Sequence, residues 1–170
     1  SQKIDEDVIA KAVAEFSGAP GRMEFIQKNP FSVVVDYAHT PDSLRKVYET
    51  LRKESENSKF EIRNSKLICV FGVAGGGRDK WKRPEMGKIA AEYCDEIILT
   101  EEDPYDENPE SILEQIESGF SKSQIPNPKS QKILDRGEAI KKAIGLARPS
   151  DMVIITGKGS EKWIHLANGK

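Results

Sequence analysis

The chain has 170 residues and a net charge of −2, from 26 lysines and arginines against 28 aspartates and glutamates. This length fits one domain with a single core, and the lack of a basic excess argues against nucleic-acid binding. No apolar run approaches the roughly 18 residues of a membrane span, and the acidic, polar N-terminus lacks the pattern of a signal peptide. We therefore expect a cytoplasmic protein with no nucleic-acid or membrane partner, whose two cysteines are buried and reduced.

Helix-like and strand-like segments alternate along the first half of the chain. Apolar residues at helical spacing predict a short amphipathic helix near the N-terminus, ended by a Gly- and Pro-containing stretch. The run Ser32-Val33-Val34-Val35 is apolar without alternation, which is typical of a strand covered on both faces. The expected elements are a helix over 5–16, strands over 23–26 and 31–35, a helix over 41–54, a polar surface loop over 55–65 and a strand over 67–71.

The second half repeats this rhythm and leaves 160–166 without an assignment. Its expected elements are a helix over 84–93, a strand over 96–100, a helix over 109–120, a loop over 121–129, a strand over 132–134, a helix over 137–147 and a strand over 152–156. Strands that alternate with helices predict an α/β, Rossmann-like three-layer domain over 1–170, with a mostly parallel sheet of about six strands and helices on both faces. In such folds, ligands bind beyond the carboxyl ends of the strands.

Polar side chains follow the strand over 31–35, just before a helix opens at Pro41. The carboxylate of Asp36 suits a ribose hydroxyl, and the imidazole of His39 suits a phosphate or a base. The alternative is that Asp36 or Thr40 only caps the helix, a position that Thr favours.

A glycine-rich turn, Gly72 to Lys80, follows the next strand. It nearly matches the phosphate-binding pattern G-x-x-x-x-G-K-[ST], but Arg78 and Asp79 replace the Lys and the Ser or Thr, so it is not a P-loop. Exposed backbone N–H groups beside Arg78, Lys80, Lys82 and Arg83 suit a carboxylate or phosphate ligand. The alternative is a flexible loop with a solvated basic cluster.

Two more strand ends carry charged residues. Five carboxylates gather between Glu101 and Glu107, where they suit a substrate amino group or a cation, or form a solvated acidic loop. Gly157-Lys158-Gly159-Ser160-Glu161 follows the last strand. Because the fold brings these strand ends to one edge, we expect them to form one site.

With these motifs in hand, the chain resembles the C-terminal domain of the Mur ligases, most of all the MurE-type branch. The resemblance covers nearly the whole chain. It rests on Gly21-Arg22-Met23-Glu24, Asp36-Tyr37-Ala38-His39-Thr40-Pro41, Arg78-Asp79-Lys80 with Lys82-Arg83-Pro84, Asp103-Pro104, and Gly157-Lys158-Gly159 with Glu161.

The resemblance implies a three-domain, ATP-dependent amide ligase that adds the third amino acid to the UDP-N-acetylmuramoyl dipeptide in peptidoglycan synthesis, and so serves the cell wall, cell shape and cell division. ATP phosphorylates the peptide carboxylate, and the incoming amino acid attacks the acyl phosphate. The resemblance places the P-loop, the Mg2+ ligands and the UDP-sugar site on an N-terminal and a central domain that this chain lacks. We therefore expect no metal site and no catalytic residue in this domain, and no activity from it alone.

Residue roles follow from the same resemblance. It implies ATP contacts from Arg22, Asp36 and His39. It implies that the amino-acid substrate is bound by Arg78, Glu102, Asp103, Tyr105, Gly157 and Glu161. Lys80 and Lys158 are further candidates for an anion contact.

Two departures from the family pattern concern the amino acid. Members that add meso-diaminopimelate have Asp-Asn-Pro-Arg where this chain has Glu102-Asp103-Pro104-Tyr105, and the lost Arg removes a bidentate carboxylate partner. A His common after Gly-Lys-Gly is Ser160 here. We therefore expect a substrate without a distal carboxylate, such as the diamino acids lysine or ornithine.

Two other interpretations remain open at this point. One stays in the superfamily: the C-terminal domain of a folylpolyglutamate synthase or a cyanophycin synthetase. The other is a stand-alone nucleotide- or anion-binding module. The Asp-Tyr-Ala-His and Arg-Asp-Lys motifs favour the Mur branch.

Overall fold

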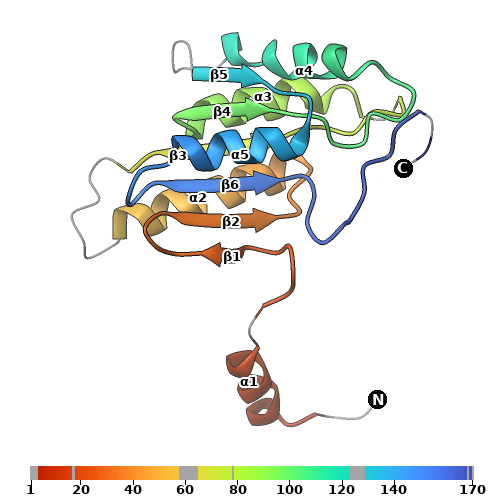
Figure 1. Cartoon of the computed structure of the whole chain (residues 1–170). Coiled ribbons are helices and arrows are strands. Elements are labelled where there is room, and N and C mark those ends of the chain that lie inside the picture. The colour runs from red at the N-terminus through yellow and green to blue at the C-terminus, as the bar shows by residue number, and fades with distance from the viewer. Residues whose placement is uncertain are drawn as a thin grey trace.

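The computed structural model describes residues 4–16, 18–57, 65–77, 79–122, 129–167 and 169. It contains one six-stranded sheet in the order β1-β2-β6-β3-β4-β5 (Figure 1). The strands are β1 (Glu24–Gln27), β2 (Ser32–Asp36), β3 (Leu67–Phe71), β4 (Glu96–Leu99), β5 (Lys129–Lys132) and β6 (Met152–Thr156). The helices are α1 (Glu6–Glu15), α2 (Pro41–Asn57), α3 (Lys82–Tyr93), α4 (Pro109–Glu117) and α5 (Arg136–Leu146), with a short 3-10 helix at Phe120–Lys122.

The pairing of the strands brings the candidate segments together. Only β1 runs antiparallel to its neighbour among the described strands, and the other four pairings are parallel. In the parallel register Asp36 lies beside Thr156, and Phe71 lies beside Leu99. Because parallel strands end at the same edge, the loops that follow β2, β3, β4 and β6 meet there. The predicted fold class is confirmed.

Helices cover both faces of the sheet and form two apolar clusters. On one face α2, α3 and α4 pack against the sheet, and the predicted inner face of α2, with Leu44 and Tyr48, is fully buried. On the other face α5 packs through Ala139 and Ala143 (Figure 1). A fully buried Leu or Ile side chain contributes about 1.5–3 kcal/mol of transfer free energy. Cys69 and Cys94 are buried free thiols, as expected.

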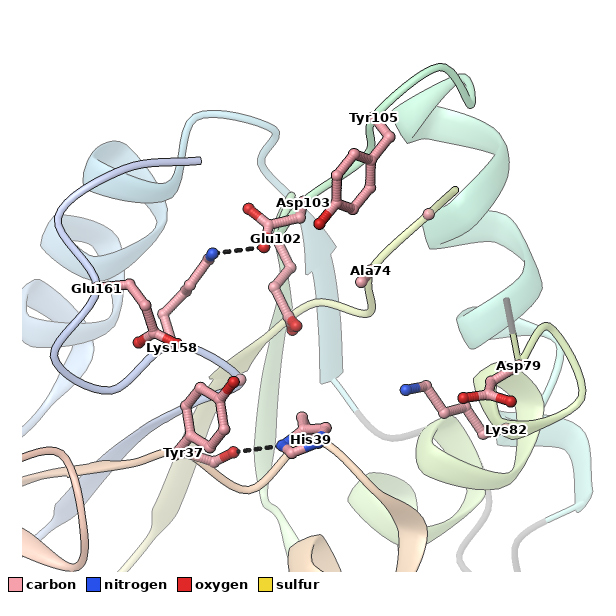
Figure 2. A pocket seen from close by; sticks show the side chains of 12 residues that line it. Tyr37, His39, Ala74, Asp79, Lys82, Glu102, Asp103, Tyr105, Lys158 and Glu161 are labelled. Carbon is pink, nitrogen blue, oxygen red and sulfur yellow. Dashed lines mark hydrogen bonds and ion pairs between the residues drawn. The ribbon is translucent and has the colours of Figure 1, made fainter. Parts of the chain in front are cut away.

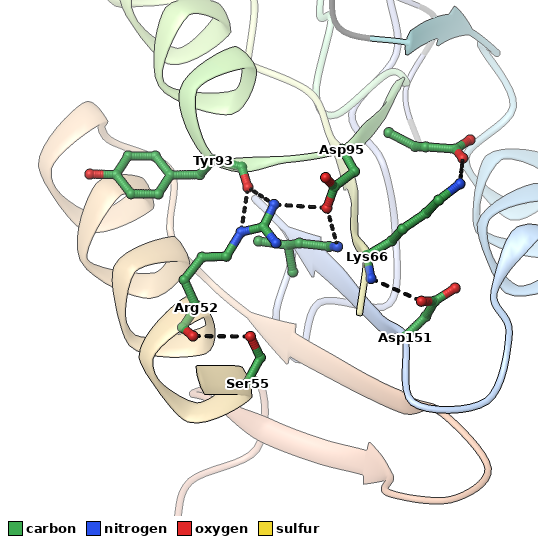
Figure 3. Close-up of polar contacts among 8 residues, drawn as sticks. Arg52, Ser55, Lys66, Tyr93, Asp95 and Asp151 are labelled. Carbon is green, nitrogen blue, oxygen red and sulfur yellow. Dashed lines mark hydrogen bonds and ion pairs between the residues drawn. The ribbon is translucent and has the colours of Figure 1, made fainter. Parts of the chain in front are cut away.

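A polar network lies at the amino-terminal ends of the parallel strands, opposite the candidate site (Figure 3). Arg52 of α2 donates from Nε to the carbonyl of Tyr93 at 2.7 Å and from Nη2 to Asp95 Oδ2 at 2.8 Å. Asp151 Oδ1 accepts from the backbone N–H of Lys66 at 2.9 Å. These contacts join the starts of β3, β4 and β6 to α2, so the loops at the other edge rest on a fixed frame.

Helix α1 contributes nothing to this core. Asp5 caps it by accepting from Asp7 N at 2.9 Å, but no residue of the helix is buried. Its apolar side chains are exposed, Val13 and Phe16 by 69% and 68%. Figure 1 shows α1 away from the sheet. No helix in the described part of the chain is long and apolar enough to cross a membrane.

Several expected boundaries were wrong. Helix α3 begins at Lys82, ahead of Pro84, because a proline is tolerated in the first turn of a helix. Helix α4 ends at Glu117, since a Cβ at Gly119 would stand 1.9 Å from Pro84 O and the chain must pass close to α3. Helix α2 extends to Asn57, and the rest of the expected 55–65 loop lies mostly outside the described residues, as does most of 121–129.

The largest error concerns the edge strand β5. It covers Lys129–Lys132, whereas the apolar pattern predicted 132–134. The strand is set by backbone pairing with β4, where Lys132 lies beside Leu99. Ile133 N donates to Leu99 O at 2.9 Å just beyond the strand. An edge strand whose side chains are mostly exposed carries no apolar signature.

Candidate active site

A cavity of about 260 Å³ opens at the carboxyl edge of the sheet (Figure 2). All four candidate loops contribute to it. Its lining is made by Tyr37, His39, Ala74, Gly75, Asp79, Lys82, Glu102, Asp103, Tyr105, Gly157, Lys158 and Glu161. The expectation that the strand ends form one site is therefore confirmed as geometry.

The glycine-rich loop after β3 packs directly on the backbone of the loop after β4. A Cβ at Gly72 would stand 2.3 Å from Thr100 O, and one at Gly75 would stand 2.1 Å from Pro104 O. Gly75 N donates to Asp103 O at 2.7 Å, and Gly77 N donates to Glu107 Oε1 at 2.7 Å. These glycines are thus required by contact between the loops, and the two N–H groups are not available to an anion.

Arg83 and Glu107 join the same two loops. Arg83 is fully buried, and its two terminal nitrogens donate to the two carboxylate oxygens of Glu107 at 3.0 and 3.1 Å. Arg83 also donates to Gln115 Oε1 at 2.8 Å and to Ala74 O at 3.2 Å. Hydrogen bonds from Arg83 and from the backbone of Gly77 lower the pKa of Glu107 to about 2. Arg83 is therefore internal and paired, whereas Lys82 of the same cluster lines the cavity, and the anion contact expected of this cluster stays a prediction.

Lys80 belongs to this cluster as well. Its ammonium lies 3.0 Å from Glu107 Oε2, and it does not line the cavity. Arg78 lies outside the described residues.

Glu102 is the most unusual group in the cavity. Burial raises the pKa of its carboxyl to about 7, against the opposing charges of Arg136 and Lys158. Its Oε2 has no hydrogen-bond partner among the described residues, and a Cβ at Gly157 would stand 2.2 Å from it. Gly157, with φ +94°, is therefore the residue that makes room for this carboxylate. An unpaired, buried carboxylate is a ready acceptor for a cationic ligand.

Asp103 and Lys158 form an ion pair beside Glu102 (Figure 2). Lys158 Nζ lies 2.6 Å from Asp103 Oδ2, and the two side chains are only 11% and 15% exposed. Glu161 is exposed, and its Oε2 accepts from Gly159 N at 2.8 Å. Lys158 was expected to contact an anion, but its ammonium group is already paired with the carboxylate of Asp103.

Tyr105 closes another side. Its backbone lies in the left-handed region, with φ +53°. Its ring stacks on His165 with centroids 5.4 Å apart and planes 7° from parallel.

The three residues expected to contact ATP occupy different places: His39 lines the cavity, Asp36 is buried, and Arg22 is exposed outside the cavity. His39 lines the cavity, and its Nδ1 donates to Tyr37 O at 3.0 Å. The guanidinium of Arg22 lies 4.3 Å from the centre of the Tyr37 ring, but Arg22 does not line the cavity. Asp36 is buried, and its oxygens accept from Ala38 N at 2.7 Å and Met23 N at 2.8 Å. This Asp36 carboxylate is therefore committed to the backbone, but not as a cap of α2, because the capping bond comes from Thr40, whose Oγ1 accepts from Ser43 N at 3.3 Å.

Several residues at or beside the cavity had no predicted role. Tyr37 and Asp79 line the cavity, although they were part of recognised motifs. Arg136 is the first residue of α5, after the fifth strand, and it donates to Thr156 O at 2.8 Å. His165 lies in the segment left without an assignment. The position of Arg136 at a strand end is the signal in the sequence that identifies it.

Comparisons with known proteins agree with the motifs. The model of the Mur ligase, glutamate ligase domain, matches residues 21–159. The UDP-N-acetylmuramoyl-L-alanyl-D-glutamate–2,6-diaminopimelate ligase of Aquifex aeolicus (strain VF5) is 46% identical over 162 residues, which are 94% of this chain and 30% of that protein. The ligase of the same name from Syntrophomonas wolfei is 44% identical over 161 residues, 94% of this chain and 31% of that protein.

Solved structures extend the comparison. A UDP-N-acetylmuramoyl-L-alanyl-D-glutamate–2,6-diaminopimelate ligase superposes with a TM-score of 0.73 at 36% identity, over 96% of this chain and 31% of that one. A bifunctional folylpolyglutamate synthase/dihydrofolate synthase from Yersinia pestis gives 0.65 at 17% identity, over 92% and 32%, which shows a common fold alone. This chain spans about a third of the length of the relatives it matches. By the match over 21–159 and the identity to these ligases, the chain belongs to the Mur ligase family, as its glutamate ligase domain.

Proposed function

We propose that this chain is the C-terminal domain of an ATP-dependent ligase that adds the third amino acid to UDP-N-acetylmuramoyl-L-alanyl-D-glutamate in peptidoglycan synthesis. The observation that carries the proposal is the 46% identity to a ligase of that name along 94% of the chain. The cavity supports it, because it collects motif residues from four loops at one edge of the sheet.

In this proposal the chain binds two of the three substrates and leaves phosphoryl transfer to other domains. The described residues contain no group of three or more His, Cys, Asp or Glu side chains that could hold a metal ion. They therefore do not fit a Mg2+ site, and no step here runs through one. His39 lies at the cavity with its Nδ1 hydrogen donated to Tyr37 O, which leaves Nε2 as the ring nitrogen available to ATP. Asp36 serves this contact indirectly, by holding Ala38 and Met23.

The amino acid is proposed to enter the cavity itself. Four carboxylates line it, on Asp79, Glu102, Asp103 and Glu161, against the ammonium groups of Lys82 and Lys158. Since Lys158 is already paired with Asp103, the remaining charge favours cations. Arg78 is proposed from its motif to hold the α-carboxylate, and Glu161 to lie near the ammonium group. The α-amine, once deprotonated, attacks the acyl phosphate: a C–N bond forms, the C–O bond to phosphate breaks, and inorganic phosphate leaves.

We further propose that the amino acid carries a side-chain amine without a distal carboxylate, as in lysine or ornithine. The relatives at 42–46% identity are named as 2,6-diaminopimelate ligases. In this chain, however, Tyr105 stands where the diaminopimelate-adding pattern has Arg, and a phenol cannot replace the planar fork of a guanidinium. A buried carboxylate without a partner is costly, so the second carboxylate of diaminopimelate would be disfavoured.

Ligation assays on the protein expressed from the complete reading frame test both proposals. The protein is incubated with ATP, Mg2+, the UDP-linked dipeptide and one of lysine, ornithine or meso-diaminopimelate, and ADP and tripeptide product are quantified. ADP and tripeptide formation in equal amounts is expected, with lysine or ornithine preferred. Absence of product with every amino acid would overturn the ligase proposal, whereas a clear preference for diaminopimelate would overturn only the substrate proposal.

A further inference from the structure

The ring of Tyr105 stacks on the imidazole of His165, with centroids 5.4 Å apart and planes 7° from parallel. Gly76 lies close to the same ring, since a Cβ added there would stand 3.2 Å from Cδ2. Tyr105 lines the cavity (Figure 2), whereas His165 is not among the lining residues and reaches the cavity only through its contact with the Tyr105 ring.

The segment that carries His165 is fastened to the loop after β4. Tyr105 N donates to His165 O at 3.0 Å, and His165 N donates to Asp103 Oδ1 at 2.8 Å. Tyr105 and Leu166 form a parallel bridge. The second oxygen of Asp103 is the one that pairs with Lys158 at 2.6 Å. These contacts fix the backbone of His165 beside Tyr105, and the imidazole itself contacts the ring through the stack.

This arrangement sets the chemistry of one wall of the pocket. The wall offers an aromatic ring, next to the carboxylates of Glu102 and Asp103. Such a surface accepts an aliphatic chain that ends in an ammonium group, because aromatic faces and carboxylates both attract cations. To a second carboxylate this wall offers only the neutral hydroxyl of Tyr105, a single donor in place of the charged two-donor fork of an Arg. If the ring swung away, the space and the solvent it admits would remove much of that penalty.

We infer that His165 is a specificity-determining positioning residue: by stacking on Tyr105 it keeps the ring in place as a pocket wall that admits a side-chain amine and rejects a second carboxylate. This inference rests on the proposed amino-acid site. It concerns a residue that touches no substrate and acts through Tyr105 alone.

The test measures amino-acid binding to the purified 170-residue chain by NMR, in separate titrations with L-lysine and with meso-diaminopimelate. The quantity compared is the ratio of the two dissociation constants. His165→Ala removes the stack and should lower the preference for lysine by roughly three- to tenfold, mainly by tighter binding of diaminopimelate. His165→Phe keeps a stacking ring and should retain the wild-type ratio.

Leu166→Ala is the matched control, because it alters the neighbouring side chain and keeps the backbone bridge; its ratio should equal that of the wild type. Amide spectra establish that each variant is folded. The inference would be overturned by an unchanged ratio of dissociation constants in His165→Ala, by a loss of lysine preference in His165→Phe as large as that in His165→Ala, or by no preference for lysine in the wild type. Failure of the complete protein to ligate any amino acid would overturn the proposed function while leaving these binding ratios to decide the role of His165.

Discussion

The ion pair between Arg83 and Glu107 should contribute measurably to the free energy of unfolding, and the size of this contribution follows from the pKa of Glu107. Glu107→Gln keeps the shape of the side chain and removes its charge. The pKa of Glu107 falls from an ordinary 4.5 to about 2 in the folded chain. At about 1.4 kcal/mol per pKa unit, the ionised carboxylate contributes about 3 kcal/mol to the free energy of unfolding near neutral pH. The substitution also leaves Arg83, which is fully buried, without a counter-ion.

The pH dependence gives the sign of the effect. Because the folded pKa lies below the unfolded one, the contribution is fully present above about pH 5 and is lost as the pH falls toward about 2. We expect the wild type to exceed Glu107→Gln by about 3 kcal/mol near pH 7, and by less than half of that near pH 3. Urea denaturation of the purified chain, followed by circular dichroism across this range, measures the difference.

The matched control is Glu117→Gln. Glu117 pairs with Lys132 at 2.8 Å, but both side chains are 40% exposed, so its loss should cost less than about 1 kcal/mol. Equal losses of stability in the two variants, or an equal loss in Glu107→Gln near pH 7 and near pH 3, would show that the charge of Glu107 does not stabilise the fold as described.

Four further predictions concern the candidate site residues and the activity of the chain. Burial raises the pKa of Glu102 to about 7, so its charge opposes folding above that pH and not below about 4.5; Glu102→Gln should therefore raise the free energy of unfolding by about 2–3 kcal/mol near pH 8 and leave it unchanged near pH 4, as urea titrations would show. Asp36→Ala should destabilise the chain by leaving two N–H groups unpaired, whereas His39→Ala should spare stability and raise the KM for ATP of the complete enzyme; thermal melts and ATP titrations separate the two. Arg78→Lys keeps the charge and loses the fork, so amino-acid kinetics should weaken roughly ten- to hundredfold while UDP-sugar kinetics hold, and normal amino-acid kinetics would refute the carboxylate contact. The chain alone should release no phosphate from ATP above a mock-purified control, since it lacks the G-x-x-x-x-G-K-[ST] pattern.

Burial explains which parts of the fold were predictable from sequence. The strands β3 and β6 were placed without error, because a strand covered on both faces is a continuous apolar run bounded by polar residues. The polar edge strand β5 was misplaced, since backbone pairing alone defines it. Helix ends depended on contacts with other elements, such as the approach of Gly119 to α3, which no local pattern encodes.

The site was predictable to a different degree. Its location followed from topology, because strand ends are visible in the sequence and parallel strands share an edge. Which polar groups remain free for a ligand did not follow. Lys80 pairs with Glu107, 27 residues away, and Asp36 accepts from the backbone of Met23, 13 residues away. Such pairings depend on the packed structure. The role of His165 was not predicted either, because its segment has no apolar periodicity that would assign it to a helix or a strand.

The exposed helix α1 should have a much lower local stability than the sheet. A helix of ten residues is marginal in water by itself, and this one has no buried side chain to couple its unfolding to that of the sheet. Its amide hydrogens should therefore exchange with solvent by local opening, far faster than those of β3, where every residue is buried and exchange requires unfolding of the core. The domain thus begins, in the energetic sense, after α1, close to residue 21 where the family match starts.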